Sequence, residues 1–205
     1  MASLGGKFVV LDGPEGCGKS TQTRMLRERL QAGGVATLAV RDPGSTRLGE
    51  RIRQMLLQPD HREMGMRCEM LLYMAARAQM MHELILPALA GGQFVLCDRF
   101  VSSTLAYQLG GDGLTLDEIR RVADIAIGGR WPDLTIILDV EPSVGFSRVR
   151  RERDRIEQRP PEYHEQVRRN FLSQAQGDPA RYRVVDAQRP AGVVHEELWA
   201  ALGGI

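Results

Sequence analysis

Lysine is almost missing from this 205-residue sequence, in which only Lys7 and Lys19 occur among 27 basic side chains. No charge of either sign prevails, because 26 acidic side chains leave a formal net charge of +1. Such a chain has no general attraction for nucleic acid or for an anionic membrane, so we expect neither as a partner. Any anion-binding site must be local. Lys19 draws attention because it is one of only two lysines among so many arginines.

Cysteines and long hydrophobic runs are also scarce. Cys17, Cys68 and Cys97 are an odd number, widely spaced, with no C-x-x-C pair and no histidine at zinc-ligand spacing, which indicates reduced thiols in a cytoplasmic protein. The apolar run Phe8–Leu11 is too short for a signal peptide, and no run approaches the roughly 20 apolar residues of a membrane span. The composition, 43% hydrophobic and 26% charged, excludes disorder. We expect one soluble domain, residues 1–205, because no linker or repeat is visible.

Short apolar runs alternate with longer segments of helical periodicity. This alternation predicts an α/β fold in which helices flank a five-stranded parallel sheet. The strands are expected at 8–11, 35–40, 94–97, 134–138 and 181–185. Helices are expected at 19–30, at 66–90 with a bend near Pro87, and at 116–127, where Thr115 and Glu118 form a capping box.

The strongest chemical signal is the segment Gly-Pro-Glu-Gly-Cys-Gly-Lys-Ser at residues 13–20, which lies between the first strand and the first helix. It matches G-x-x-x-x-G-K-[ST], the P-loop that wraps its backbone N–H groups around a polyphosphate. Lys19 is expected to reach the β and γ phosphates, and Ser20 to supply a ligand to a Mg²⁺ cofactor. The predicted ATP-binding residues are Gly13, Pro14, Glu15, Gly16, Cys17, Gly18, Lys19, Ser20 and Thr21.

A P-loop alone leaves an NTPase, a guanine-nucleotide switch and a small-molecule kinase open. The switch needs an N-K-x-D element, but the one asparagine, Asn170, is followed by Phe171. An arginine-rich segment at about 148–160 could fold over the phosphates as a mobile lid. A lid that neutralises phosphate charge and excludes water favours a kinase acting on a small acceptor.

A second motif begins where the third expected strand ends. It reads Asp-Arg-Phe at 98–100 and continues through Ser103, Thr104, Ala106, Tyr107 and Gln108. Here the chain resembles the thymidylate kinase family, whose signature is Asp-Arg-aromatic, two residues, Ser, a small residue, any residue, Ala, aromatic and Gln. Further matches lie in order at 41–44, 71–77, 154–158 and 186–187. The resemblance implies a P-loop nucleoside monophosphate kinase fold, a homodimer, and transfer of phosphate from ATP to dTMP in dTTP biosynthesis.

Asp98 and Arg99 are expected at the carboxyl edge of the sheet, beside the P-loop. There the carboxylate can hold magnesium together with Ser20, and the guanidinium can bind an acceptor phosphate bidentately. A structural salt bridge between Asp98 and Arg99 is the alternative. The resemblance assigns Arg99 to the monophosphate of dTMP.

Tyr73 and Arg77 lie one helical turn apart and therefore share a face. Taken alone, the pair fits a core aromatic and a solvated arginine. The resemblance implies instead that the thymine base stacks on Tyr73 and that Arg77 hydrogen-bonds a base carbonyl. It places Tyr107 beneath the sugar, where the ring excludes a 2′-hydroxyl. The other expected dTMP-binding residues are Arg41, Arg53, Ser103, Thr104 and Gln108.

Glu15 is the acidic residue inside the P-loop, and it either faces solvent or meets the 3′-hydroxyl of the acceptor sugar together with a basic partner. The P-loop has no arginine of its own, which resembles the bacterial subtype that brings catalytic arginines from its lid. Arg148, Arg150, Arg151 and Arg153 are the candidates, with Arg148 preferred. The predicted catalytic set is Glu15, Lys19, Arg99, Arg148 and Arg153.

Departures from the family pattern affect loops and not charges: Asp42 replaces a Glu, Ser45 a Gly and Phe100 the commoner Tyr. The histidines form no ligand spacing and are expected at the surface or hydrogen-bonded within helices. Two rivals to a dTMP kinase remain. One is a kinase for another nucleoside monophosphate or a deoxynucleoside, and the other is an ATP-binding module without catalysis.

Overall fold

The computed structural model describes residues 4–205, and its centre is a five-stranded sheet in the order β2-β3-β1-β4-β5. All four strand pairings are parallel. The strands are β1 (Phe8–Asp12), β2 (Thr37–Arg41), β3 (Phe94–Asp98), β4 (Leu134–Asp139) and β5 (Tyr182–Asp186). The predicted α/β class and parallel sheet are confirmed, and each strand lies within two residues of its expected bounds.

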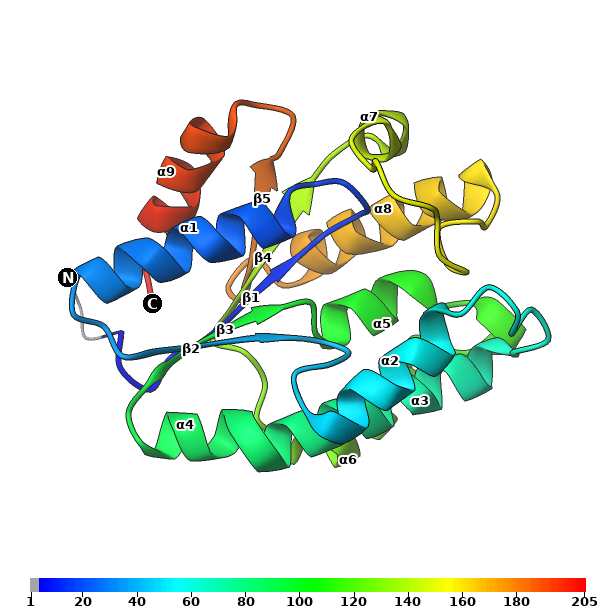
Figure 1. Ribbon diagram of the computed structural model, residues 1–205, viewed down its shortest axis with the longest axis horizontal. Helices are drawn as coiled ribbons and strands as arrows, with labels where there is room; N and C mark the ends of the chain where they lie inside the picture. Colours follow the sequence, from blue (N-terminus) through cyan, green and yellow to red (C-terminus); the bar gives the residue numbers. More distant parts are fainter. Residues whose placement is uncertain (1–3) are drawn as a thin grey trace.

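Helices cover both faces of this sheet, as Figure 1 shows. They are α1 (Lys19–Ala32), α2 (Arg47–Leu57), α3 (Met66–Met80), α4 (Leu86–Ala90), α5 (Val101–Tyr107), α6 (Leu116–Ile127), α7 (Pro142–Ser147), α8 (Pro161–Gly177) and α9 (Ala191–Leu202). The expected capping box of α6 is present, with Thr115 and Glu118 each bonded to the backbone of the other.

Alternation along β1 divides the core between the two faces. Phe8 and Val10 pack with α3, α4 and α6, whereas Val9 and Leu11 pack with α1 and α9. All four side chains are fully buried. Because both faces of the central strand are covered, β1 is apolar at every position except its last residue, Asp12.

The irregularity expected near Pro87 is a π-helical turn, Met81–Ile85, between α3 and α4. Proline has no N–H, and its ring clashes with the carbonyl four residues earlier. The π turn ahead of Pro87 relieves this conflict without ending the helix.

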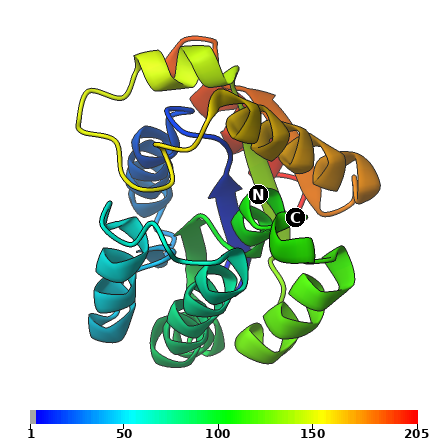
Figure 2. The same ribbon diagram turned by 90° about the vertical axis from the view of Figure 1, so that its right-hand side faces the viewer.

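The carboxyl ends of the strands meet at the edge where the P-loop begins. The arginine-rich segment follows α7 and reaches α8 as an open loop, drawn in yellow in Figure 2. Its second part is anchored, since Arg155, Ile156 and Glu157 are buried. No helix within residues 4–205 is long and apolar enough to cross a membrane.

Candidate active site

A cavity of about 1010 Å³ opens at the carboxyl edge of the sheet. Its walls come from the P-loop, the ends of β2 and β3, the helices α3 and α5, and the segment after α7. The sequence-predicted residues that line it are Glu15, Gly16, Cys17, Gly18, Lys19, Ser20, Thr21, Arg41, Arg53, Tyr73, Arg77, Asp98, Arg99, Ser103, Thr104, Tyr107, Gln108 and Arg148. Residues far apart in sequence therefore share one site.

The P-loop wraps tightly at the end of β1. Gly16 has a φ of 67°, and a Cβ there would lie 1.9 Å from the carbonyl oxygen of Gly145 in α7. Only glycine fits this approach. Lys19 is buried, and its Nζ donates to the carbonyls of Gly13, at 2.9 Å, and Pro14, at 2.8 Å. The loop thus holds its cation close to the backbone that would receive a phosphate.

Ser20 and Asp98 face each other across the start of α1, with 3.5 Å between Ser20 Oγ and Asp98 Oδ2. Mg²⁺ prefers oxygen ligands and is commonly held by one or two protein groups together with water and phosphate oxygens. The pair fits that pattern. No cluster of three or more His, Cys, Asp or Glu side chains suited to a metal occurs in the described part of the chain.

Arg99 and Glu15 form the central charge pair of the cavity. Arg99 Nη2 donates to Glu15 Oε2 at 2.6 Å, and Tyr107 donates from its hydroxyl to Glu15 Oε1 at 2.7 Å. Arg99 Nη1 also lies 3.1 Å from both Gly13 O and Ser103 Oγ. Glu15 therefore has a basic partner, and its contact with the 3′-hydroxyl of an acceptor stays a prediction.

Each of these two side chains stabilises the charged form of the other, although both are shielded from solvent. Burial opposes ionisation of Glu15, but Arg99 and then Lys19 bring its pKa below the usual value. Burial would also lower the pKa of Arg99, yet Glu15, Tyr107, Asp12 and Asp98 together outweigh that effect and raise it. Both side chains are therefore charged at neutral pH.

Asp12 is a site residue that sequence reasoning missed. It is fully buried and accepts hydrogen bonds from Ser102 Oγ at 2.5 Å and Ser103 Oγ at 2.7 Å. Arg99 Nη1 lies 3.5 Å from its Oδ1. Arg99 itself has a left-handed backbone with a φ of 69°, which is uncommon for a residue with a side chain. The available signal was a carboxylate ending an otherwise apolar strand directly before the P-loop.

Arg77 is not the solvated arginine that the bare spacing suggests, because it is 1% exposed. Its Nε donates to Asp42 Oδ2 at 2.6 Å, and its Nη2 donates to Phe100 O at 3.1 Å and Thr104 Oγ1 at 3.2 Å. The substitution Asp42 thus supplies the counterion of Arg77. Tyr73 and Arg77 both line the cavity, so the expected common face is confirmed.

Gln108 lies at the end of α5 and is also buried, with its Nε2 donating to Glu69 Oε1 at 2.7 Å. Glu69 Oε2 accepts from Arg155 at 2.5 Å and Arg159 at 2.7 Å. Sequence reasoning overlooked Glu69, although it lies one helical turn before Tyr73. This buried carboxylate joins the cavity wall to the anchored end of the arginine-rich segment.

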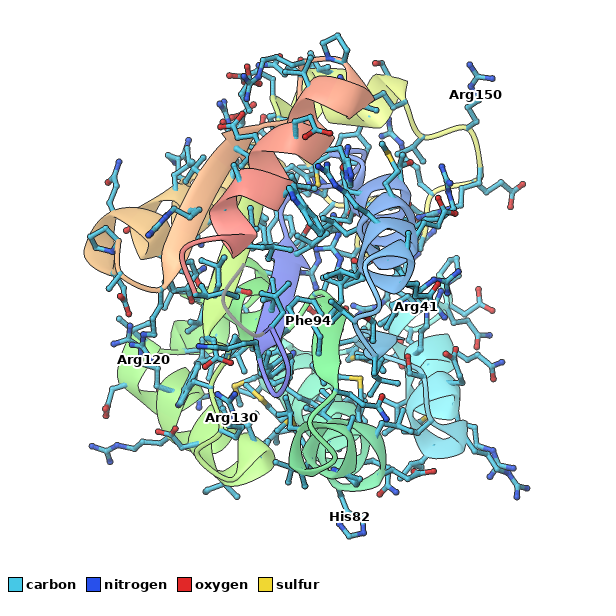
Figure 3. All side chains as sticks on the ribbon, turned by 90° about the vertical axis from the view of Figure 1, so that its left-hand side faces the viewer. Arg41, His82, Phe94, Arg120, Arg130 and Arg150 are labelled. Atoms are coloured by element: carbon cyan, nitrogen blue, oxygen red, sulfur yellow. The ribbon has the colours of Figure 1, made fainter. Side chains whose placement is uncertain are left out.

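The arginine-rich segment distributes its guanidinium groups unequally. Arg148, Arg150 and Arg151 line the cavity, and Arg148 Nη1 donates to Ala187 O at 3.0 Å. Arg150 extends away from the protein in Figure 3. Arg153 is not brought into the cavity wall, since its guanidinium stacks 4.6 Å from the ring of Phe146. The structure therefore favours Arg148 over Arg153.

Two further arginines lie where β2 leads into α2. Arg41, labelled in Figure 3, is exposed and pairs with Glu50 at 3.1 Å. Arg53 Nη1 donates to Pro43 O at 3.1 Å. Both line the cavity. A stretch after β5 that includes Ala187, Pro190 and Val194 lines it as well, and of these three residues the sequence had indicated only Ala187.

The expectation for the histidines fails for one ring nitrogen in each of two side chains. His164 and His195 are buried, and His164 Nε2 and His195 Nδ1 have no hydrogen-bond partner. His164 instead packs its ring edge-on to Phe146 at 4.7 Å and Tyr163 at 5.4 Å. Histidine can fill such an aromatic position because its ring is similar in shape.

The chain is similar to known proteins over nearly its whole length. A thymidylate kinase from Deinococcus radiodurans is 44% identical over 201 residues, covering 96% of each chain. One from Pseudomonas fluorescens (strain Pf0-1) is 47% identical over 195 residues, covering 94% of this chain and 93% of that protein. The crystal structure of thymidylate kinase from Ehrlichia chaffeensis matches with a TM-score of 0.78 and 30% identity, over 96% of this chain and 98% of that one. Residues 11–198 match the family model described as thymidylate kinase, and the chain belongs to the thymidylate kinase family.

Proposed function

We propose that this protein is a kinase that transfers the γ-phosphoryl group of ATP to dTMP, giving ADP and dTDP, in dTTP biosynthesis. The observation that carries the proposal is the single cavity in which a P-loop and the Asp98-Arg99 segment lie side by side. Arg99 Nη1 donates to the carbonyl of Gly13, so the two motifs touch directly. A donor site and an acceptor site in contact are what phosphoryl transfer requires.

The P-loop holds the donor. Its N–H groups and the start of α1 cradle the β and γ phosphates, and Lys19 turns from its loop carbonyls to the γ-phosphate. Ser20 and Asp98 hold Mg²⁺, which neutralises phosphate charge when it is bound. The stretch after β5 closes the other side of this half of the cavity.

The acceptor lies between Arg99 and α3. Arg99 binds the monophosphate, with Arg41 and Arg53 contributing charge at the end of β2. The base stacks on Tyr73, with Arg77, Thr104 and Gln108 around its polar edge, and the sugar lies over Tyr107. Ser103 acts mainly by supporting Arg99, because its hydroxyl is already bonded to Asp12.

In the transfer, an oxygen of the dTMP phosphate forms a bond to the γ-phosphorus while the bond to the β,γ-bridging oxygen breaks. Negative charge spreads over the transferred group, and Lys19, Arg99 and Arg148 neutralise it. Arg153 could join them only if it left the ring of Phe146, so its catalytic role stays a prediction. Glu15 keeps Arg99 in place and meets the 3′-hydroxyl of the acceptor.

Pairing of two chains is part of the proposal. Leu48 and Met55 of α2 and Leu71 of α3 are each about half exposed, which is unusual for large apolar side chains. A homodimer through these helices would cover them, and sedimentation at several concentrations tests this. We place the protein in the cytoplasm, with no nucleic acid or membrane as partner.

A substrate panel tests the function. ATP and Mg²⁺ are supplied with dTMP, dUMP, UMP or thymidine, and release of ADP is measured. We expect the highest kcat/KM with dTMP. Preference for UMP or for thymidine would favour the rival kinases, and ATP binding without ADP release for any acceptor would favour a non-catalytic module.

A further inference from the structure

Glu69 in α3 is a fully buried carboxylate, and its hydrogen-bond partners in the described part of the chain are all donors. Its Oε1 accepts from Gln108 Nε2 at 2.7 Å, and its Oε2 accepts from Arg155 and Arg159 at 2.5 and 2.7 Å. A carboxylate only accepts hydrogen bonds, and a guanidinium only donates them. Neither the carboxylate of Glu69 nor the two guanidinium groups can exchange the roles of acceptor and donor.

This fixed polarity determines how Gln108 is oriented. A side-chain amide has an NH₂ donor and a carbonyl acceptor that point in different directions. Because the carboxylate of Glu69 can face only the NH₂ group, the carbonyl oxygen Oε1 must point elsewhere. Within residues 4–205, no side chain or N–H group donates a hydrogen bond to Oε1 of Gln108, and this oxygen is not one of the buried polar atoms that lack a partner. Gln108 lines the cavity, so its carbonyl oxygen is an acceptor presented there.

Arg77 lines the same cavity and offers only donors. A base held between Gln108 and Arg77 therefore meets one acceptor and one donor. Thymine and uracil match this pair, because their N3–H is a donor beside a carbonyl oxygen. Cytosine presents the reverse pattern, an unprotonated N3 beside an amino group, and would set acceptor against acceptor and donor against donor.

We propose that Glu69 is a positioning residue for base selection: it fixes the amide of Gln108 with its carbonyl toward the cavity, and so selects pyrimidines with an N3–H against cytosine. The inference rests on the proposed function and adds the residue that sets base specificity from outside the cavity wall. Glu69 does this without touching the substrate.

Glu69→Gln tests the inference because it should reverse the orientation of the Gln108 amide. Arg155 and Arg159 still need an acceptor, so the carbonyl of the new amide faces them and its NH₂ faces Gln108. Gln108 must then turn, presenting its own NH₂ to the cavity. We expect the ratio of kcat/KM for dTMP to that for dCMP to fall roughly tenfold or more, with activity on dCMP rising relative to wild type. The KM for ATP should not change.

Glu157→Gln is the matched control. Glu157 is also a buried carboxylate of the arginine-rich segment and pairs with Arg151 at 2.7 Å, but, unlike Glu69, it accepts no hydrogen bond from Gln108. It should leave the dTMP to dCMP ratio as in wild type, even if both rates fall. The acceptor dUMP should follow dTMP in every variant, because it shares N3–H and lacks only the methyl group.

Gln108→Met provides a second route if Glu69→Gln does not fold. It leaves the pairing of Glu69 with the two arginines intact and removes the amide of residue 108. Discrimination against dCMP should therefore weaken, but activity on dCMP should not rise as it does in Glu69→Gln. A wild-type ratio in either folded variant would overturn the inference. Absence of dTMP phosphorylation by the wild-type protein would instead overturn the proposed function.

Discussion

Replacing Tyr107 separates the role of its ring from that of its hydroxyl. The side chain is 6% exposed, and its ring packs edge-on against Phe171 at 5.9 Å and Tyr163 at 6.3 Å. Burial raises the pKa of Tyr107, so the hydroxyl stays protonated and donates to Glu15. The ring borders the cavity while the hydroxyl holds the charge pair, and two substitutions distinguish these functions.

Tyr107→Phe keeps the ring and removes the hydrogen bond to Glu15. A hydrogen bond to a charged group is worth about 1.5–3 kcal/mol, so kcat/KM for dTMP should fall roughly 10- to 150-fold. The preference for dTMP over ribothymidine monophosphate should stay as in wild type, because the ring still occupies the space that a 2′-hydroxyl needs.

Tyr107→Ala removes the ring as well. In the wild type, a 2′-hydroxyl buried against the ring without a partner costs about 1–3 kcal/mol, which gives a roughly 5- to 150-fold preference for dTMP over ribothymidine monophosphate. In Tyr107→Ala this preference should narrow toward unity. Both kcat/KM values are measured by coupled ADP release, after circular dichroism shows that the variant folds, since loss of a buried ring costs about 3–5 kcal/mol. An unchanged ratio with both substrates reduced together would refute the reasoning and make Tyr107 a packing residue.

Three further substitutions test other residues, two of them in the site and one, His164, outside it. Lys19→Met should leave a folded protein whose kcat is reduced by roughly 10² or more, because a positioned charge is lost where negative charge develops; near-normal turnover would contradict the P-loop assignment. Arg99→Ala should raise the Kd for dTMP in calorimetry far more than the Kd for ATP, whereas equal losses would make Arg99 structural. Burial lowers the pKa of His164, so the unfolded chain binds its proton first and stability falls as pH drops below about 6.5. His164→Phe removes this pH-dependent loss of stability together with the unpartnered Nε2, so it should raise the free energy of unfolding at about pH 5 by roughly 1 kcal/mol. Denaturant titrations that give the same pH profile for variant and wild type would contradict this prediction.

Features set by nearby residues could be predicted from the sequence. The strands are apolar runs, the P-loop is a contiguous motif, and the α6 capping box needs only Thr115 and Glu118. In each case the physical cause lies within a few residues, so a single sequence shows it.

Partners brought together by the fold could not be predicted in this way. Asp42 looked like a loop substitution, but it is the buried counterion of Arg77, 35 residues later. Glu69 had no visible partner, because Gln108 and Arg155 reach it from other elements. The sequence favoured Arg148 among the lid arginines but gave no contact for any of them, and the fold separates Arg148 at the cavity from Arg153 on Phe146.

The close approach of Gly16 and Gly145 determines where the lid can bend. A Cβ on Gly145 would lie 2.2 Å from the carbonyl oxygen of Glu15, so α7 and the P-loop meet backbone to backbone with no side chain between them. Two surfaces in such contact cannot slide past each other without one of them distorting. We infer that α7 does not move relative to the P-loop, so that any closure over the phosphates is confined to the chain beyond Ser147. The other end of this segment is held by the pairing of Arg155 with Glu69. The lid predicted from the sequence would then be a short segment held at both ends, which could tighten onto a nucleotide but could not swing open as a rigid arm.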